Sequence, residues 1–218
     1  EISWQQGHAV SFLPKWHKDR VGSSSHVHQS LWKDDESIFY DKLKPHGMSD
    51  LMKHYMAGLI KYAPEYTYFL APYVNSYKRF SKGTFAPTKT VWSIDNRTAG
   101  FRLCGENTVG VRVECRIGGS DLNPYLAQSV MLAAGIKGIE ENLVLSSATT
   151  GDIYEDSKAA DIPQSLRLAT ENLRNSDFLR EALGDDVVDH YTRAAEWEQE
   201  EFDRVITDWE IARGFERA

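Results

Sequence analysis

The spacing of apolar residues changes near Asn123, and this change limits the possible folds more than any other feature of the sequence. Before Asn123, the alternation of apolar and polar residues predicts strands over 8–15, 25–31, 88–94, 100–104 and 109–117. Helical spacing predicts helices over 50–70, 124–143 and, after a polar connector at 146–163, throughout 165–217. Strands that are followed by a long helical region predict an α+β fold.

The length of 218 residues suits one sizeable core, so a single α+β unit is the simplest arrangement. The first residue is Glu1, and residues 1–6 have the pattern of the end of a helix. We therefore interpret the sequence as a fragment of a longer protein, with natural processing as the alternative.

Composition limits the partners and the compartment. A formal net charge of −7 argues against a nucleic-acid partner, because such proteins usually carry a basic face. No apolar stretch approaches the roughly 20 residues that cross a bilayer, so we expect a soluble protein without a membrane partner. The two cysteines, Cys104 and Cys115, lie in strand-like runs, which favours reduced, packed thiols and a cytoplasmic location.

Two histidines in the 25–31 strand form the first candidate site. Side chains of a strand alternate between its faces, so His26 and His28 point to the same face, beside Ser24 and Ser30. Imidazoles and hydroxyls suit a metal or phosphate site better than a core. Two surface histidines on a half-exposed strand are the simpler alternative.

A second candidate site lies in the 109–117 strand. Arg112 and Arg116 flank Glu114 on one face, while apolar residues occupy the other. The guanidinium groups keep the carboxylate ionised, so that it is able to ligate a hard divalent ion. An Arg-Glu-Arg ladder on a solvent-facing strand is the alternative.

Three further arginines, Arg79, Arg97 and Arg102, lie within the same short part of an acidic chain. Arginines that gather around a carboxylate and a histidine suit phosphoryl transfer to an acid, because they stabilise negative charge spread over several oxygens.

Five blocks follow one another in this region: GSSSHVHQSLW (22–32), NSYKR (75–79), NRT (96–98), ECR (114–116) and NPYLA (123–127). Their order and spacing closely resemble the glutamine synthetase family, although each block alone is weakly specific. The end of the chain, at 205–210, is similar to the C-terminal helices of the amine-using members.

The resemblance implies part of an antiparallel sheet packed with helices, with a partial catalytic core over 1–144 and a C-terminal helical part over 145–218. It implies an ATP-dependent ligase that joins glutamate to an amine, or to ammonia, through γ-glutamyl phosphate. Two Mg²⁺ or Mn²⁺ ions per site and a homo-oligomeric ring, with sites between neighbouring subunits, also follow from the resemblance. Because an N-terminal domain is absent here, the fragment alone should be inactive.

The resemblance also implies roles for individual residues. His26 and Glu114 hold the second ion, together with a glutamate upstream of this chain. His28, Ser30 and Arg112 bind ATP; Gly22, Arg79 and Arg116 bind glutamate; Arg97 and Arg102 act on the transferred phosphoryl group.

Departures from the family pattern point to the nucleophile. Ammonia-using members usually carry a glutamate before the Ala-Pro pair of this loop, whereas Phe85 stands before Ala86 here. The 117–121 run also looks more like the amine-using branch, which favours a γ-glutamylamide or γ-glutamylpolyamine ligase. Val21 replaces a usual asparagine, which puts one glutamate contact in doubt, and we interpret Tyr154 as an ordinary surface tyrosine. Glutamine synthetase itself and a non-catalytic relative are the alternatives.

Overall fold

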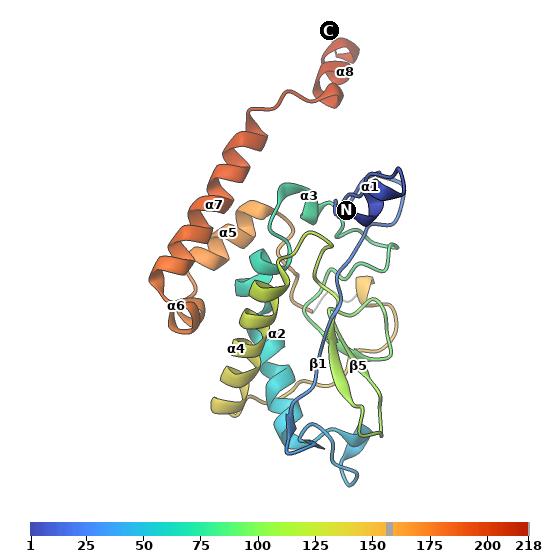
Figure 1. Cartoon of the computed structure of the whole chain (residues 1–218), viewed down its shortest axis with the longest axis vertical. Helices are drawn as coiled ribbons and strands as arrows, with labels where there is room; N and C mark the ends of the chain where they lie inside the picture. The colour runs from blue at the N-terminus through green and yellow to red at the C-terminus, as the bar shows by residue number, and fades with distance from the viewer. Residues whose placement is uncertain (156–158, 218) are drawn as a thin grey trace.

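The computed structural model describes residues 1–155 and 159–217 of the chain. A small sheet lies on one side of the molecule, and the long helices α2 (Asp50–Leu70) and α4 (Pro124–Glu140) lie against it (Figure 1). The outer helices are α5 (Leu166–Arg174), α6 (Asp177–Leu183), α7 (Asp185–Asp203) and α8 (Asp208–Glu216). The α+β prediction is confirmed.

The sheet has the strand order β1-β6-β5-β4. Its strands are β1 (Val27–Gln29), β4 (Trp92–Ile94), β5 (Phe101–Cys104) and β6 (Arg112–Cys115). The β1–β6 and β6–β5 pairs are antiparallel as expected, but β4 runs parallel to β5. Two consecutive strands can be parallel only if the loop between them leads the chain back to the start of the first strand. Because β4 has only three residues, the loop over 95–100 is long enough to do so.

Alternate residues of β6 point into the core, as the period predicts. Val111, Val113, Cys115 and Ile117 are at most 1% exposed. Behind the sheet, α2 starts where Ser49 accepts a hydrogen bond from the Met52 amide at 3.1 Å. The Tyr55 hydroxyl of α2 donates to Gln29 of β1 at 3.0 Å and so fixes the sheet against the helix.

Two sequence predictions need correction. No strand forms over 8–15; that segment has no neighbouring strand and is held by Asn75, whose amide side chain bonds both backbone groups of Lys15 at 2.9 Å. The 165–217 region is helical as expected but breaks into four helices. The first break is at Asn175 and Ser176, the second is at Gly184 with φ of 88°, and the third lies before Thr207, which caps α8.

The other elements are short. They are α1 (Ile2–Gln5), α3 (Val74–Tyr77), the 3₁₀ turns η1 (Pro45–Gly47) and η2 (Ile153–Glu155), and the hairpin strands β2 (Trp32–Lys33) and β3 (Glu36–Ser37). Of the expected connector over 146–163, residues 156–158 lie outside the described part.

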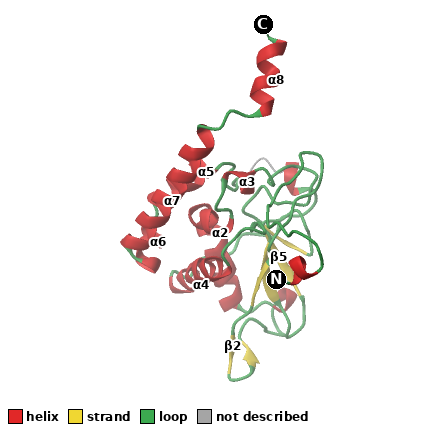
Figure 2. Cartoon of the chain, turned by 45° about the horizontal axis from the view of Figure 1, so that its top comes forward, coloured by secondary structure: helices red, strands yellow, loops and turns green. Residues whose placement is uncertain are grey.

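The outer helices are joined to α2. Asn172 of α5 donates to the Pro64 carbonyl at 3.2 Å, and the Ser176 hydroxyl before α6 donates to Glu65. Figure 2 shows α8 well away from the remaining helices, at the end of the arm that α7 begins. The division into 1–144 and 145–218 stays a prediction. Within the described residues, no helix is long and apolar enough to cross a membrane.

Candidate active site

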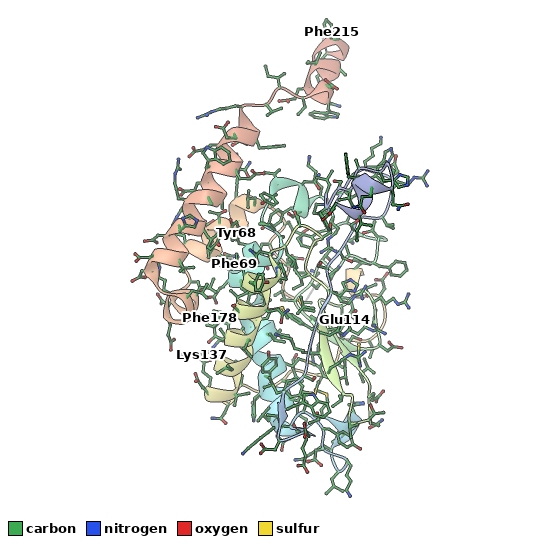
Figure 3. The ribbon with its side chains drawn as sticks, viewed as in Figure 1. Tyr68, Phe69, Glu114, Lys137, Phe178 and Phe215 are labelled. Atoms are coloured by element: carbon green, nitrogen blue, oxygen red, sulfur yellow. The ribbon has the colours of Figure 1, made fainter. Side chains whose placement is uncertain are left out.

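One row of polar side chains crosses the sheet. Strand register places Glu114 of β6 opposite His28 of β1 on one side and Arg102 of β5 on the other. Directly opposed residues share a face and lie close together. Figure 3 places Glu114 on the sheet, away from Lys137 and the outer helices.

Glu114 is the centre of this row, and it is only 4% exposed. Its Oε1 atom lies 3.1 Å from His26 Nδ1, 3.1 Å from Arg116 Nη1 and 3.6 Å from His28 Nε2. Its Oε2 atom accepts a hydrogen bond from Arg102 Nη1 at 2.9 Å. Burial opposes ionisation, but the Arg102 hydrogen bond and the charge of Arg116 outweigh it and lower the pKa of Glu114.

Both histidines favour the neutral form. Burial, reinforced by Arg116, lowers the pKa of His26, and burial also lowers the pKa of His28 despite the nearby Glu114. The Arg112 side chain donates to His28 Nδ1 at 3.2 Å, so Nε2 of that ring carries the proton. The Ser24 hydroxyl lies 3.0 Å from His26 Nε2.

This donor set fits part of a divalent-metal site. An ionised carboxylate and a neutral imidazole, 3.1 Å apart, are both ligand types that divalent ions accept. Within residues 1–155 and 159–217, however, no group of three or more His, Cys, Asp or Glu side chains is arranged to hold a metal ion. His26 and Glu114 offer two donors, so an ion bound there would need further ligands from elsewhere.

Arg116 connects three segments at the site. Beside Glu114, it donates from Nε to the Arg97 carbonyl at 3.0 Å and from Nη2 to the Phe85 carbonyl at 3.5 Å. The guanidinium therefore joins the loop after β4 and the loop over 81–87 to β6.

Arg79 is a nearly buried cation behind this cluster. It is 4% exposed, its Nη2 donates to the Ile117 carbonyl, and its Nε has no hydrogen-bond partner among the described residues. Burial lowers the pKa of Arg79 to about 10, so it stays charged at neutral pH. Gly22 packs on this side chain: a Cβ atom there would lie 2.9 Å from Arg79 Cγ and 2.3 Å from the Pro14 carbonyl oxygen.

The structure does not bring two of the predicted site residues into the cluster. The Arg97 side chain is exposed, and only its carbonyl contacts Arg116. The Ser30 hydroxyl accepts a hydrogen bond from Trp32 at 2.9 Å instead of facing Glu114.

Sequence reasoning missed Asp95. Its carboxylate pairs with Arg102 Nη2, while Nη1 of the same guanidinium holds Glu114, so two acids orient Arg102. Asp95 has φ of 49°, a conformation that aspartate tolerates better than most residues. The sequence offered one indication of its place near the site, which is that Asp95 lies two residues before the candidate residue Arg97.

Two residues of the neighbouring loops differ in their exposure. Phe85 is 60% exposed, with φ of 58°. Tyr154 is 8% exposed and donates to the Ala86 carbonyl at 2.9 Å, so the expectation of a surface tyrosine was wrong. Its hydroxyl satisfies a buried carbonyl, which is why it lies inside.

Comparison with known proteins gives the class to which this fold and site belong. The glutamine synthetase catalytic-domain family matches residues 1–214, so the chain belongs to the glutamine synthetase family. It is 41% identical over 217 residues to the gamma-glutamylethanolamide synthetase of Streptomyces coelicolor, covering 100% of this chain and 46% of that protein. It is 37% identical over 219 residues to the glutamine synthetase of Thermus thermophilus, covering 97% and 49%.

Solved structures agree. A structure entitled GmaS/ADP complex superposes with a TM-score of 0.84 at 26% identity, covering 94% of this chain and 49% of that one. The family and fold expected from the five sequence blocks are thus confirmed. The chain spans about half the length of the curated relatives that it matches.

Proposed function

We propose that the protein containing this chain is an ATP-dependent ligase that joins the side-chain carboxylate of glutamate to an amine. The observation that supports this most is the ionised, nearly buried Glu114, held between Arg102, Arg116 and His26. Burial alone would disfavour the charged form, but the two guanidinium groups keep Glu114 ionised and thus able to bind a metal cation, and family membership supports the same reading.

In the proposed reaction, the glutamate γ-carboxylate attacks the terminal phosphorus of ATP, and the bond to ADP breaks. The amine nitrogen then attacks the acyl carbon of γ-glutamyl phosphate, loses a proton, and inorganic phosphate leaves with the bonding electrons. Arg102 and Arg97 are proposed to stabilise the charge on the transferred phosphoryl group. Arg79 and Arg116 are proposed to hold the carboxylates of glutamate, where the backbone of Gly22 approaches it.

The proposed nucleotide and metal roles are those that the family resemblance implies. His26 and Glu114 would hold one divalent ion, Mg²⁺ or Mn²⁺, which supplies positive charge to the nucleotide phosphates. Arg112 and His28, joined at 3.2 Å, and Ser30 are proposed to lie beside ATP. Two such ions per site, a cytoplasmic location and a homo-oligomeric ring are part of the proposal and rest on the family resemblance.

Phe85 supports an organic amine as the nucleophile. Its ring is exposed, while its carbonyl lies 3.5 Å from Arg116 Nη2, so the ring is attached to the loop that borders the proposed glutamate site. An apolar ring is able to pack against the carbon chain of an amine, and it has no group that deprotonates ammonium. Similarity to a gamma-glutamylethanolamide synthetase points the same way.

The test measures phosphate release by the full-length protein with ATP, Mg²⁺ or Mn²⁺, and glutamate. Release should require an added organic amine such as ethanolamine or putrescine, and ammonia should be the poorer substrate. Phe85→Glu should shift the preference towards ammonia. Turnover with ammonia alone would contradict the amine preference, and no turnover with any nucleophile would contradict the ligase.

A further inference from the structure

A cavity lies on the helical side of the molecule, between the C-terminal end of α2, the turn before α4, and α7. Its volume is about 290 Å³. Figure 3 labels Tyr68 and Phe69 at this end of α2, between the outer helices and Glu114. None of the residues assigned above to ATP, glutamate or metal lines this cavity.

Aromatic side chains form much of its wall: Tyr68, Phe69, Tyr73, Tyr191 and Trp197. The Tyr191 ring meets the Phe69 ring edge to face, with centroids 5.4 Å apart, and lies 6.2 Å from the Tyr68 ring. Tyr73 and Trp197 are 50% and 56% exposed, so their rings border the opening to solvent.

The charged groups of this wall are all acidic. Asp121 and Glu198 line the cavity, and among the described residues no lysine or arginine does. Neither carboxylate lies within ion-pair distance of a cationic side chain among the described residues, although the Arg79 guanidinium acts on Asp121 from farther away. Asp121 accepts one hydrogen bond, from the Ser76 hydroxyl at 2.6 Å, and its Oδ1 atom is buried without a partner among the described residues. Burial outweighs that bond and raises the pKa of Asp121.

The position of Glu198 is fixed by α7. Tyr191, Ala194 and Glu198 follow at helical spacing and therefore share one face of the helix, towards α2. Glu198 lies about two turns after Tyr191 on this face of the helix.

We propose that this cavity binds a small organic ammonium ion. The faces of aromatic rings attract cations, and the carboxylate of Glu198, which has no ion-pair partner among the described residues, adds negative charge to the wall. A volume just below the about 300–1,000 Å³ of typical ligand pockets suits a ligand of few heavy atoms. The inference does not depend on the ligase activity, because none of the residues assigned to that activity lines the cavity.

The probe is choline, whose quaternary nitrogen has no proton to lose and therefore cannot act as the amine substrate. Its neutral counterpart is 3,3-dimethylbutan-1-ol, in which carbon replaces the charged nitrogen. Binding of each to the full-length protein is measured by calorimetry or by saturation-transfer NMR. Choline should bind, and the alcohol should bind roughly fivefold more weakly or not at all.

Variants locate the binding. Glu198→Gln and Trp197→Leu should each weaken choline binding roughly fivefold, because each removes one attraction for the cation. Both positions are partly exposed, so the variants should fold, which circular dichroism checks. Glu201→Gln, on the same helix but outside the cavity and paired with Arg204, is the matched control and should bind as the wild type does.

Three results would overturn the proposal. These are the absence of choline binding at millimolar concentration, equal affinity for choline and the alcohol, and unchanged choline affinity in both the Glu198 and the Trp197 variants.

Discussion

At the scale of single residues, the central feature is a carboxylate that is surrounded by nitrogen atoms. Glu114 lies within 3.6 Å of two imidazoles and two guanidinium groups. Arg116 is nearly as buried as Glu114, at 6% against 4% exposed. The two therefore depend on each other: when one partner of a buried pair is removed, the other charge is left uncompensated.

The first prediction concerns this pair. Arg116→Met should lower the free energy of unfolding by about 3 kcal/mol or more, because it leaves Glu114 buried with fewer partners. Adding Glu114→Gln should recover part of the loss, giving a coupling energy of about 1–3 kcal/mol in a double-mutant cycle followed by urea denaturation.

Arg193→Met is the control for this cycle. Arg193 is an exposed arginine, with 61% side-chain exposure, paired with Glu196 and Glu200, so its removal should change stability little. Additive effects of the Arg116 and Glu114 substitutions would show that the two side chains do not support each other.

The residues of this centre could be predicted from the sequence where the alternation of side chains along a strand decides which face they occupy. His26, His28, Glu114 and Arg116 meet because alternate residues share a face. Ser30 and Arg97 do not join them, because Ser30 bonds Trp32 and the Arg97 side chain is exposed. The alternation of side chains along a strand does not predict the positions of residues such as these, which depend on the geometry of a loop or strand end.

At the scale of elements, the packing of α2 on α4 depends on glycine. A Cβ atom on Gly58 would lie 2.2 Å from the Ala134 carbonyl oxygen and 2.8 Å from Gly138 Cα, both backbone atoms. The helices therefore approach closely at this level, and the sheet rests on α2 through Tyr55.

The second prediction tests this contact. Gly58→Ala should destabilise the protein by about 1–3 kcal/mol, because the backbone of α4 must move away. Gly214→Ala, in α8 with nothing within 4 Å, is the matched control and should be neutral or slightly stabilising. Thermal unfolding measures both. Equal effects at the two positions would mean that the helices are not in close contact at Gly58.

The third prediction concerns the junction of α2 with α6, where Glu65 accepts a hydrogen bond from Ser176. Burial raises the pKa of Glu65 above its ordinary value of 4.5 in the folded state. The folded protein thus holds this proton more tightly than the unfolded chain, and stability falls as pH rises from 4.5 through the folded pKa.

Glu65→Gln should remove that part of the pH dependence and make the protein more stable than the wild type at neutral pH. The amide oxygen still accepts the Ser176 hydrogen bond. The measurement is the midpoint of urea unfolding at a series of pH values from 4 upwards. Parallel wild-type and variant curves would contradict the raised pKa.

Helices and strands were predicted best where the features that determine them lie within the segment itself. The helix over 50–70 has a serine cap and apolar residues at helical spacing, and its bounds were predicted correctly. The expected strand over 8–15 had alternation but no neighbouring strand to pair with. The direction of β4 relative to β5 depends on the loop that joins them, which hydrophobic spacing does not describe.

At the scale of the whole molecule, the chain supplies about half of what its relatives contain. Its two proposed metal donors leave a hard ion mostly hydrated. We therefore expect the isolated chain to bind Mn²⁺ weakly and to lack ligase turnover, whereas the full-length protein should have it. Tight calorimetric binding of Mn²⁺ by the isolated chain would contradict this expectation.

The account as a whole depends on Glu114 as part of a catalytic centre. The most direct test is the rate of phosphate release by full-length Glu114→Gln protein with ATP, Mn²⁺, glutamate and amine, compared with Glu36→Gln on the exposed β2–β3 hairpin. We predict a loss of about 10²–10³-fold for the Glu114 variant and wild-type turnover for the Glu36 variant. A folded Glu114→Gln protein that releases phosphate at the wild-type rate would contradict the account.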